Sequence, residues 1–245
     1  MNTTPWPLDG EVHLYGLALP HDPAELARLG GLLTTGEIDR AALLKSEPAK
    51  RRCLAGRGLL REILGAYLGL DAKQVQLATG EHGKPFLLGA TVNLDFNLAH
   101  SGENLLLAIA VNRAVGIDLE LIDPGKPLRE MARLVFSRRE QEQLSPLASP
   151  RLEAVFYRNW VRKEACLKAC GRGFSLPGNS FELSPLDEKP TVMIACCNQQ
   201  SWQVLDLAVP RGYCAALAVE SRCSTQSPPT VVRVEHPLSF NWSRL

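Results

Sequence analysis

The feature that most constrains the fold is an order of elements that occurs twice along the chain. In each half, an alternating apolar stretch typical of a strand precedes a Ser/Thr-x-x-Glu capping box, which marks a helix start, and then a long amphipathic helix. The two capping boxes, Thr34 to Glu37 and Ser137 to Glu140, are related by one offset of 103 residues. Few residues are identical, so the repeat is one of element order. It predicts two similar α/β (α+β) halves related by a pseudo-twofold axis, with a cleft between them of the kind that commonly binds ligands.

The expected elements set the boundaries. Strands are predicted at 11–19, at 96–111 as a pair around a turn containing His100, and at 115–122; long helices are predicted at 48–68 and 151–170. Four further strands are expected within 181–219, in FELS, VMIACCN, SWQVLDLAV and YCAALAV. We therefore expect an N-terminal half at 1–114, a C-terminal half at 115–220 and a mobile or surface-draped extension at 221–245, which is rich in Ser, Thr and Pro.

Composition narrows the class of protein. The formal net charge of +1 argues against a general nucleic-acid or membrane-surface binder. No stretch has the length of a membrane span and the start does not resemble a signal peptide, so a cytoplasmic protein is expected. The cysteines have no repeated metal-ligand spacing, and we expect them to be reduced packing residues. They are Cys53, Cys166, Cys170, Cys196, Cys197, Cys214 and Cys223.

Three acidic residues suggest a metal site. In the strand VGIDLE, Asp118 and Glu120 should project from one face, and Glu164 lies beside an apolar stripe of the second long helix. Each also has an ordinary interpretation, since the strand pair can be a solvated face and Glu164 can pair with Lys168 at i, i+4. If the acids converge, they offer the oxygen ligands that Mg²⁺ prefers alongside substrate phosphates.

The first half carries positive charge that could meet a phosphate. The start of its long helix holds Lys50, Arg51, Arg52, Arg57 and Arg61. Arg57 falls on the apolar face, where bound phosphate would explain it, although snorkelling to solvent is the alternative. His100 and Lys84 can likewise contact phosphate or satisfy local backbone groups. Carboxylates facing cations across a cleft suit Mg²⁺-assisted chemistry on a phosphorylated substrate.

The ordered motifs resemble one family. GEHGKPF, FNLAHSG, VGIDLE, FSRRE, WVRKEACLKACGRGFSLP and GYCAALAV, in this order and at these separations, are similar to the Sfp-type phosphopantetheinyl transferases, with G-I-D-x-E and W-x-x-K-E-x-x-x-K as the strongest joint match. The resemblance implies a monomeric pseudo-dimer that binds coenzyme A. It also implies Mg²⁺-dependent transfer of phosphopantetheine to a serine of acyl or peptidyl carrier proteins, with release of adenosine 3′,5′-bisphosphate.

The resemblance also assigns roles by position. Asp118, Glu120 and Glu164 match the Mg²⁺-binding acids, and Lys168 matches the lysine near the reacting phosphate. The expected coenzyme A contacts are Arg40, Arg52, Lys84 and His100, with Arg40 at the 3′-phosphate. Ala99 departs from the family's usual serine, so one hydroxyl contact to the cofactor is expected to be missing.

The reaction sets demands on these residues. Glu164 is the candidate base, directly or through a metal-bound water, while Lys168 and His100 would offset charge on the pyrophosphate. Lys163 is expected to orient Glu164 or to contact the cofactor or partner. Carrier proteins are typically acidic, so the segment PLREMARLVF, with Arg129 and Arg133 beside apolar residues, is a candidate docking surface.

Two other functions fit the same residues. One is a Mg²⁺-dependent phosphohydrolase or nuclease, which would also use three acids and a lysine; the low net charge disfavours a nuclease. The other is a module that binds coenzyme A or a carrier without turnover, which the intact acids and Lys168 disfavour. The motifs do not select among carriers of fatty-acid, siderophore or other secondary-metabolite biosynthesis.

Overall fold

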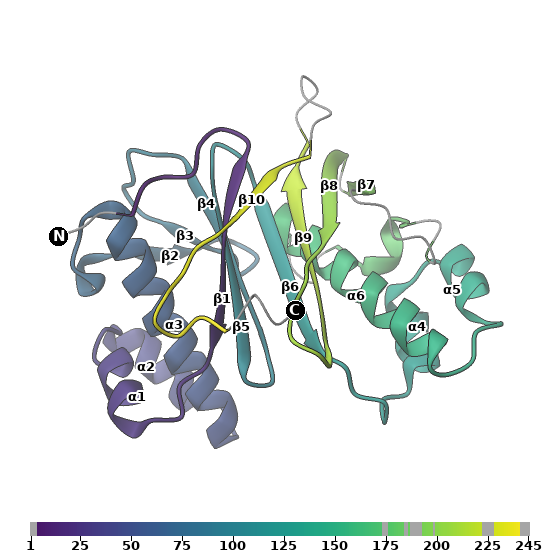
Figure 1. Ribbon diagram of the computed structural model, residues 1–245, viewed down its shortest axis with the longest axis horizontal. Helices are drawn as coiled ribbons and strands as arrows, with labels where there is room; N and C mark the ends of the chain where they lie inside the picture. Colours follow the sequence, from purple (N-terminus) through teal and green to yellow (C-terminus); the bar gives the residue numbers. More distant parts are fainter. Residues whose placement is uncertain are drawn as a thin grey trace.

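Two β-sheets lie between the two long helices (Figure 1). The computed structural model describes residues 4–172, 176–183, 186, 193–197, 199–221 and 228–240. Its helices and strands confirm the α+β fold class expected from the sequence. None of the helices in these ranges has the length and apolar character needed to cross a membrane.

The first half of the chain builds one sheet and its helices. Its elements are β1 (Glu11–Ala18), α1 (Pro23–Gly30), α2 (Thr35–Ala42), α3 (Glu47–Leu68), the 3₁₀ turn η1 (Ala72–Gln74), β2 (Leu77–Thr79), β3 (Pro85–Leu87), β4 (Leu94–Ser101) and β5 (Asn104–Val111). The sheet has the order β10-β1-β5-β4, and β2 pairs with β3 in a separate hairpin. Leucines of α3 pack against the outer face of this sheet in one apolar core.

The second half builds the other sheet. Its elements are β6 (Val115–Leu121), α4 (Leu128–Val135), α5 (Arg138–Leu144), α6 (Arg151–Cys170), the 3₁₀ turn η3 (Gly178–Ser180), β7 (Met193–Cys197), β8 (Gln200–Asp206), β9 (Tyr213–Glu220) and β10 (Thr230–Arg233). Strand β10 joins the sheet of the first half. The other four strands form the second sheet, in the order β6-β9-β8-β7. The helix α6 covers its outer face, while a third apolar core joins the inner faces of the two sheets.

Both predicted capping boxes are present, and each also supplies a buried charge. Thr34 and Ser137 accept from the backbone N–H of the glutamate three residues on. Beyond its cap, Glu37 accepts from Arg61 Nε of α3 at 2.8 Å, and Glu140 pairs with Lys163 Nζ of α6 at 2.7 Å. In both halves, therefore, a cap glutamate anchors the short helix to the long one.

The two sheets meet along β4 and β6 through side chains. Polar residues of β4 accept hydrogen bonds from alternate backbone N–H groups of β6: Asp95 from Val115 at 2.7 Å, Asn97 from Ile117 at 2.9 Å and Ser101 from Leu121 at 2.9 Å. We call this set the β4–β6 ladder. It satisfies amides at the edge of a strand that would otherwise be unpaired. The ladder fixes the register of β6, which carries two of the predicted acids.

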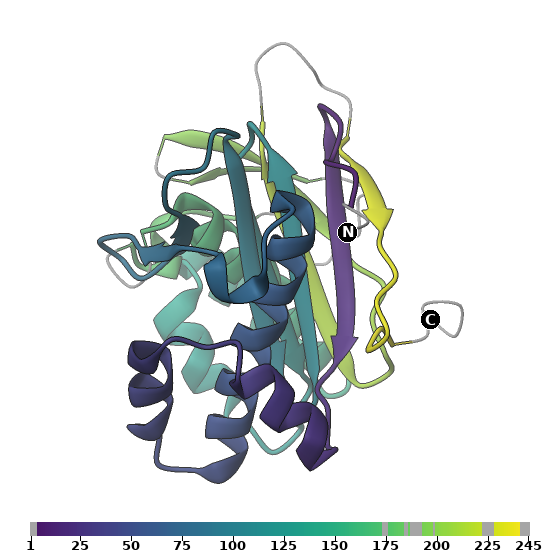
Figure 2. The same cartoon turned by 90° about the vertical axis from the view of Figure 1, so that its left-hand side faces the viewer.

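Two sequence predictions differ from the structure. Residues 181–183 of FELS form no strand, and the fourth residue lies outside the described ranges. The extension is not simply a loose tail, because Thr230–Arg233 forms β10, which pairs in parallel with β1 (Figure 2). A strand this short, with little alternation, gives a weak signal in the sequence. Residues 222–227, which include Cys223, and 241–245 lie outside the description.

Candidate active site

The acidic cluster depends on the close approach of β6 and α6. Gly116 of β6 faces α6 so closely that a Cβ atom there would lie 2.1 Å from the Ala165 carbonyl oxygen and 2.3 Å from the Ala169 backbone nitrogen. Only glycine permits this contact between backbones. It brings Glu164 of α6 beside Asp118 of β6, as the sequence predicted.

A cavity of about 560 Å³ lies over this contact, and we call it the acidic pocket. It is lined by His100, Asp118, Leu119, Glu120, Leu134, Val135, Trp160, Glu164, Leu167, Lys168, Leu176, Pro177 and Gly178. Strand β4, strand β6, helix α4 and helix α6 all contribute. All three predicted metal ligands and both predicted catalytic residues therefore line one cavity, together with one of the predicted cofactor contacts.

The Asp118 carboxylate is nearly fully buried, and its two oxygens differ. Lys168 Nζ donates to Oδ1 at 2.6 Å. Oδ2 is buried and has no hydrogen-bond partner among the described residues. An unsatisfied carboxylate oxygen in such a position is costly unless a ligand or cation meets it. The structure therefore leaves one oxygen of Asp118 available to a bound group.

Glu120 is held by Ser101, the last residue of β4. Ser101 Oγ accepts from the Leu121 backbone N–H at 2.9 Å and donates to Glu120 Oε2 at 3.1 Å. One hydroxyl thus links the β4–β6 ladder to an acid of the pocket. No hydrogen bond or ion pair of Glu164 is found with the described part of the chain.

The three carboxylates repel one another. Burial raises the pKa of Asp118, although the Lys168 ammonium opposes the shift. Burial, together with the charge of Asp118, raises the pKa of both Glu120 and Glu164, and Glu120 adds to the effect on Glu164. Clustered carboxylates with raised pKa values call for a compensating cation.

The residues fit Mg²⁺ in their chemistry. They supply carboxylate oxygens, one of them unsatisfied, in a cavity where further positive charge is favourable. In the described part of the chain, no three side chains of His, Cys, Asp or Glu already stand at metal-binding spacing. Mg²⁺ is commonly held by one or two carboxylates together with waters and substrate phosphates, so a site here does not need three protein ligands already in place.

A smaller cavity of about 210 Å³, the basic pocket, adjoins the acidic one. It is lined by Arg52, Cys53, Gly56, Arg57, Leu60, Pro85, Asn97, Leu98 and His100. His100 lines both cavities, at the penultimate residue of β4 and not in the turn that the sequence suggested. Partial desolvation lowers the pKa of His100, and the charges of Arg52 and Lys168 lower it further.

The predicted phosphate contacts in the first half have different settings. Arg52 lines the basic pocket, and its charge helps to lower the pKa of His100. The two side chains are therefore close enough to share one bound anion. Arg40 is exposed on α2 and lies close enough to Arg57 to help lower its pKa, after the larger effect of burial. Arg57 has a protein partner, since its Nε lies 3.3 Å from Glu37 Oε1, which explains its place on the apolar face without a phosphate.

Lys84 joins the two halves. Its Nζ donates to Asp95 Oδ2 at 2.5 Å and to the Val115 carbonyl at 2.9 Å, beside the first rung of the β4–β6 ladder. Lys84 is not among the residues that line the acidic pocket or the basic pocket. To contact a phosphate, Lys84 would have to leave Asp95.

The prediction for Lys163 is wrong. Its side chain is fully buried, paired with Glu140, and donates to the carbonyls of Gly178 at 2.8 Å and Phe181 at 2.6 Å. The next residue of α6, Glu164, faces the acidic pocket, as does Trp160 three residues before Lys163. Helical rotation separates the two side chains, so Lys163 holds the 176–183 segment and neither orients Glu164 nor reaches a partner.

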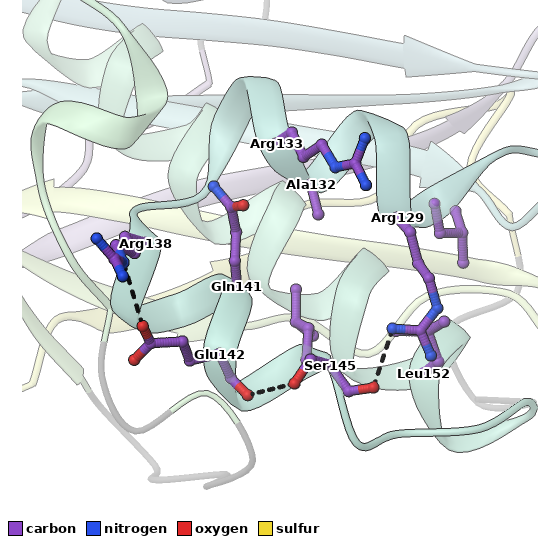
Figure 3. A pocket seen from close by; sticks show the side chains of 10 residues that line it. Arg129, Ala132, Arg133, Arg138, Gln141, Glu142, Ser145 and Leu152 are labelled. Carbon is purple, nitrogen blue, oxygen red and sulfur yellow. Dashed lines mark hydrogen bonds and ion pairs between the residues drawn. The ribbon is translucent and has the colours of Figure 1, made fainter.

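The candidate docking helix α4 lies between two cavities. On one side Leu134 and Val135 line the acidic pocket. On the other, a hollow of about 320 Å³ opens between α4, α5 and the start of α6 (Figure 3). There Arg129 donates to the carbonyls of Ser145 at 3.0 Å and Leu147 at 2.7 Å. Arg129 therefore caps the end of α5, which leaves Arg133 as the cation of α4 better suited to a partner.

Sequence reasoning missed the ladder residues. The sequence did contain a signal for them: polar residues occur at every second position of an otherwise apolar strand, at Asp95, Asn97 and Ser101. Such spacing places the polar side chains on one face of β4. Ala99 occupies the remaining rung and is buried between the sheets. Its side chain faces β6, and the expected loss of one hydroxyl contact to the cofactor stays a prediction.

The sequence is similar to known proteins across both halves. The family model described as the 4′-phosphopantetheinyl transferase superfamily matches residues 114–218, and that of the 4′-phosphopantetheinyl transferase N-terminal region matches residues 23–112. The 4′-phosphopantetheinyl transferase HetI of Nostoc sp. is 36% identical over 214 residues, which cover 86% of this chain and 89% of the relative.

Two more distant relatives extend the similarity. A 4′-phosphopantetheinyl transferase of Bacillus subtilis is 30% identical over 168 residues, covering 64% of this chain and 73% of the relative. The L-aminoadipate-semialdehyde dehydrogenase-phosphopantetheinyl transferase of Xenopus laevis is 28% identical over 216 residues, covering 80% of this chain and 67% of the relative.

Proposed function

Because this chain belongs to the 4′-phosphopantetheinyl transferase superfamily and is an enzyme of that type, we propose that it transfers the phosphopantetheine group of coenzyme A to a serine of acyl or peptidyl carrier proteins. Transfer converts the apo carrier to its holo form and releases adenosine 3′,5′-bisphosphate. The observation that carries the proposal is the meeting of the acidic and basic pockets at His100. A pyrophosphate donor needs carboxylates for a metal on one side and cations for phosphates on the other.

The proposed roles follow from position in the two pockets. Arg52 and His100 bind phosphate oxygens of coenzyme A at the basic pocket, and Arg40 approaches from its exposed position on α2. Asp118, Glu120 and Glu164 would hold Mg²⁺, which when bound supplies electrostatic stabilisation of charge on the pyrophosphate. Lys84 joins the phosphate contacts only if it leaves Asp95.

Glu164 is the proposed general base. A raised pKa brings a carboxylate closer to the basicity that a general base needs near neutral pH. Glu164 accepts the proton of the carrier's serine hydroxyl while the serine oxygen attacks the β-phosphorus of coenzyme A. Lys168, whose ammonium lies in the same pocket, offsets charge on the phosphate oxygens. In-line placement of the hydroxyl accounts for much of the rate.

The carrier is proposed to dock over α4. Leu134 is 74% exposed and lines the acidic pocket, and Arg133 is the neighbouring cation. An acidic carrier bound there would hold its serine close to Glu164.

The division of labour between the halves is part of the proposal. Residues 1–114 would supply nucleotide and phosphate contacts, and residues 115–220 the metal-binding acids and the catalytic helix. The ranges of the two family models support this boundary. Residues 221–245 are the extension, within which Thr230–Arg233 pairs with β1. We propose that the enzyme acts as a cytoplasmic monomer.

One experiment tests the reaction. Purified protein is incubated with coenzyme A, Mg²⁺ and an apo carrier, and the intact mass of the carrier is followed with and without EDTA. We expect a Mg²⁺-dependent mass gain of one phosphopantetheine, which Glu164→Gln abolishes while circular dichroism stays unchanged. Hydrolysis of coenzyme A without a carrier, at the rate of transfer, would support a phosphohydrolase. Binding of coenzyme A without modification of carriers from several pathways would support a binding module.

A further inference from the structure

Two cysteines meet at the C-terminal end of the catalytic helix. Cys170 is the last residue of α6, and Cys197 is the last residue of β7. Their Sγ atoms lie 3.1 Å apart, and both are free thiols. A disulfide bond is about 2 Å long, so the thiols need to approach by only about 1 Å to be joined.

Their surroundings hold the pair in place and give each sulfur a different exposure. Cys197 is fully buried, and its carbonyl accepts from the indole Nε1 of the buried Trp202 at 3.3 Å. Cys170 is half-buried at the helix end. Of the two residues, Cys170 is therefore the more exposed to a small oxidant from solvent.

The electrostatics favour the same order of reaction. The hydrogen bond between the two thiols lowers the pKa of Cys170, and the nearby Lys84 ammonium adds to the shift. The same contact raises the pKa of Cys197. A thiolate, not a thiol, is the nucleophile in oxidation by peroxide, so Cys170 is the residue that reacts first.

Cys166 provides an internal contrast. It lies one turn earlier on α6, is fully buried, and burial raises the pKa of its thiol. Reactivity is therefore directed to the end of the helix and not to any thiol on it.

We propose that Cys170 and Cys197 form an oxidation site that takes hydrogen peroxide. The Cys170 thiolate attacks one peroxide oxygen, breaking the O–O bond; it becomes a sulfenic acid, and the leaving hydroxide takes up a proton to form water. The Cys197 sulfur then attacks the Cys170 sulfur, displacing a second water and forming the disulfide. The two thiols lose two electrons and two protons together, and the peroxide is reduced to two molecules of water.

The disulfide would fasten the last turn of α6 to β7. Lys168, which pairs with Asp118, lies in that turn. The site is nevertheless separate from transfer chemistry, since neither cysteine lines the acidic or the basic pocket. The proposal therefore does not depend on which carrier is used.

The test uses the full-length protein in its reduced form. After a graded hydrogen peroxide treatment, free thiols are alkylated, and the protein is digested without reduction and analysed by mass spectrometry. We expect a peptide pair joined through Cys170 and Cys197, with loss of two hydrogen atoms, that dithiothreitol separates. Cys196→Ser is the matched control, because Cys196 is the exposed neighbour of Cys197 and its removal should leave the link intact.

Two results would overturn the proposal. One is the appearance of sulfinic or sulfonic acid on Cys170 with Cys197 still alkylated, since a resolving thiol should intercept the sulfenic acid. The other is a link of equal yield through Cys196 or another cysteine in place of Cys197. Both results can be read in the wild-type protein, so neither depends on whether Cys170→Ser folds; that variant is expected to lose the link.

Discussion

At the scale of single residues, the site is organised around Asp118. Its buried carboxylate has one oxygen on Lys168 and one without a partner among the described residues, and its charge adds to the effect of burial in raising the pKa of both neighbouring acids. The arrangement stores electrostatic repulsion in the free protein. A cation and a phosphorylated donor are the groups that relieve it.

Ser101 is expected to position Glu120. In Ser101→Ala, Glu120 loses its hydroxyl donor and the Leu121 N–H loses its acceptor, so Glu120 should rotate away from the metal-binding position. We expect the Mg²⁺ concentration for half-maximal transfer to rise by about 10-fold or more, as for other partners of metal ligands. Titration of transfer rates with Mg²⁺, beside the KM for coenzyme A, measures this. Ser101→Thr keeps the hydroxyl and should restore the wild-type requirement; equal Mg²⁺ curves for all three proteins would contradict the role.

The acidic cluster should make the stability of the metal-free protein fall as pH rises. The folded-state pKa of Glu164 lies above its unfolded value, so between the two values the native state binds more protons than the unfolded state. The contribution of Glu164 to the free energy of unfolding is therefore most favourable below the ordinary glutamate pKa of 4.5 and declines as pH increases through the raised value. Glu164→Gln removes this contribution and should be more stable than wild type at pH 7 in EDTA.

Urea denaturation at several pH values checks this expectation. Glu130→Gln on α4 is the control, because Glu130 is exposed and its loss should leave the pH dependence as in wild type. A Glu164→Gln protein that is no more stable than wild type at pH 7 would argue against a repulsive cluster.

At the scale of elements, the packing of α6 on β6 decides the geometry of the site. The sequence predicted both elements and their faces, since α6 covers Arg151–Cys170 and ends at Gly171 with a left-handed backbone, at a φ of 65°. It did not reveal how closely they pack. Gly116 sets that distance, because any larger residue meets backbone atoms that cannot rotate away.

Gly116→Ala is expected to separate the two elements. The added methyl group would force α6 away from β6, at a cost of about 1–3 kcal/mol in unfolding free energy. A shift of about 1 Å between Glu164 and Asp118 should lower the transfer rate by about 100-fold, more than the loss of folded protein explains. Denaturation and transfer assays on the same preparation compare the two effects. Gly36→Ala on α2, where a Cβ meets nothing within 4 Å, should alter neither measurement adversely.

At the scale of the whole molecule, the two sheets act as one frame. The β4–β6 ladder and Lys84 connect the edge of one sheet to the edge of the other, and an apolar core fills the space between their inner faces. This connection places His100 from the first half next to Asp118 from the second. The extension adds to the same frame, because β10 covers the edge of β1.

Carrier docking also belongs to this scale, because it needs α4 and the acidic pocket together. Arg133→Glu should raise the KM for an acidic carrier by about fivefold, equivalent to about 1 kcal/mol, and leave the KM for coenzyme A unchanged. Lys73→Glu makes the same charge change on an exposed residue of η1 in the other half and is the control. Steady-state kinetics with each substrate varied in turn measures both values; a carrier KM that is the same in all three proteins would remove α4 as the docking surface.

The sequence by itself determined the local features. The capping boxes at Thr34 and Ser137 and the long helices follow from residue type and periodicity, which act over a few residues. The G-I-D-x-E and W-x-x-K-E motifs likewise identified Asp118, Glu120 and Glu164 as one set. These patterns are local, so a single sequence displays them.

Only the tertiary structure decided which groups meet. It paired Lys168 with Asp118, Arg57 with Glu37 and Lys163 with Glu140, and it turned Ala99 toward β6. It also brought Cys170 to Cys197 and β10 to β1. Such contacts join residues distant in sequence, and the choice among possible partners depends on burial and on the register between elements, which no local pattern encodes.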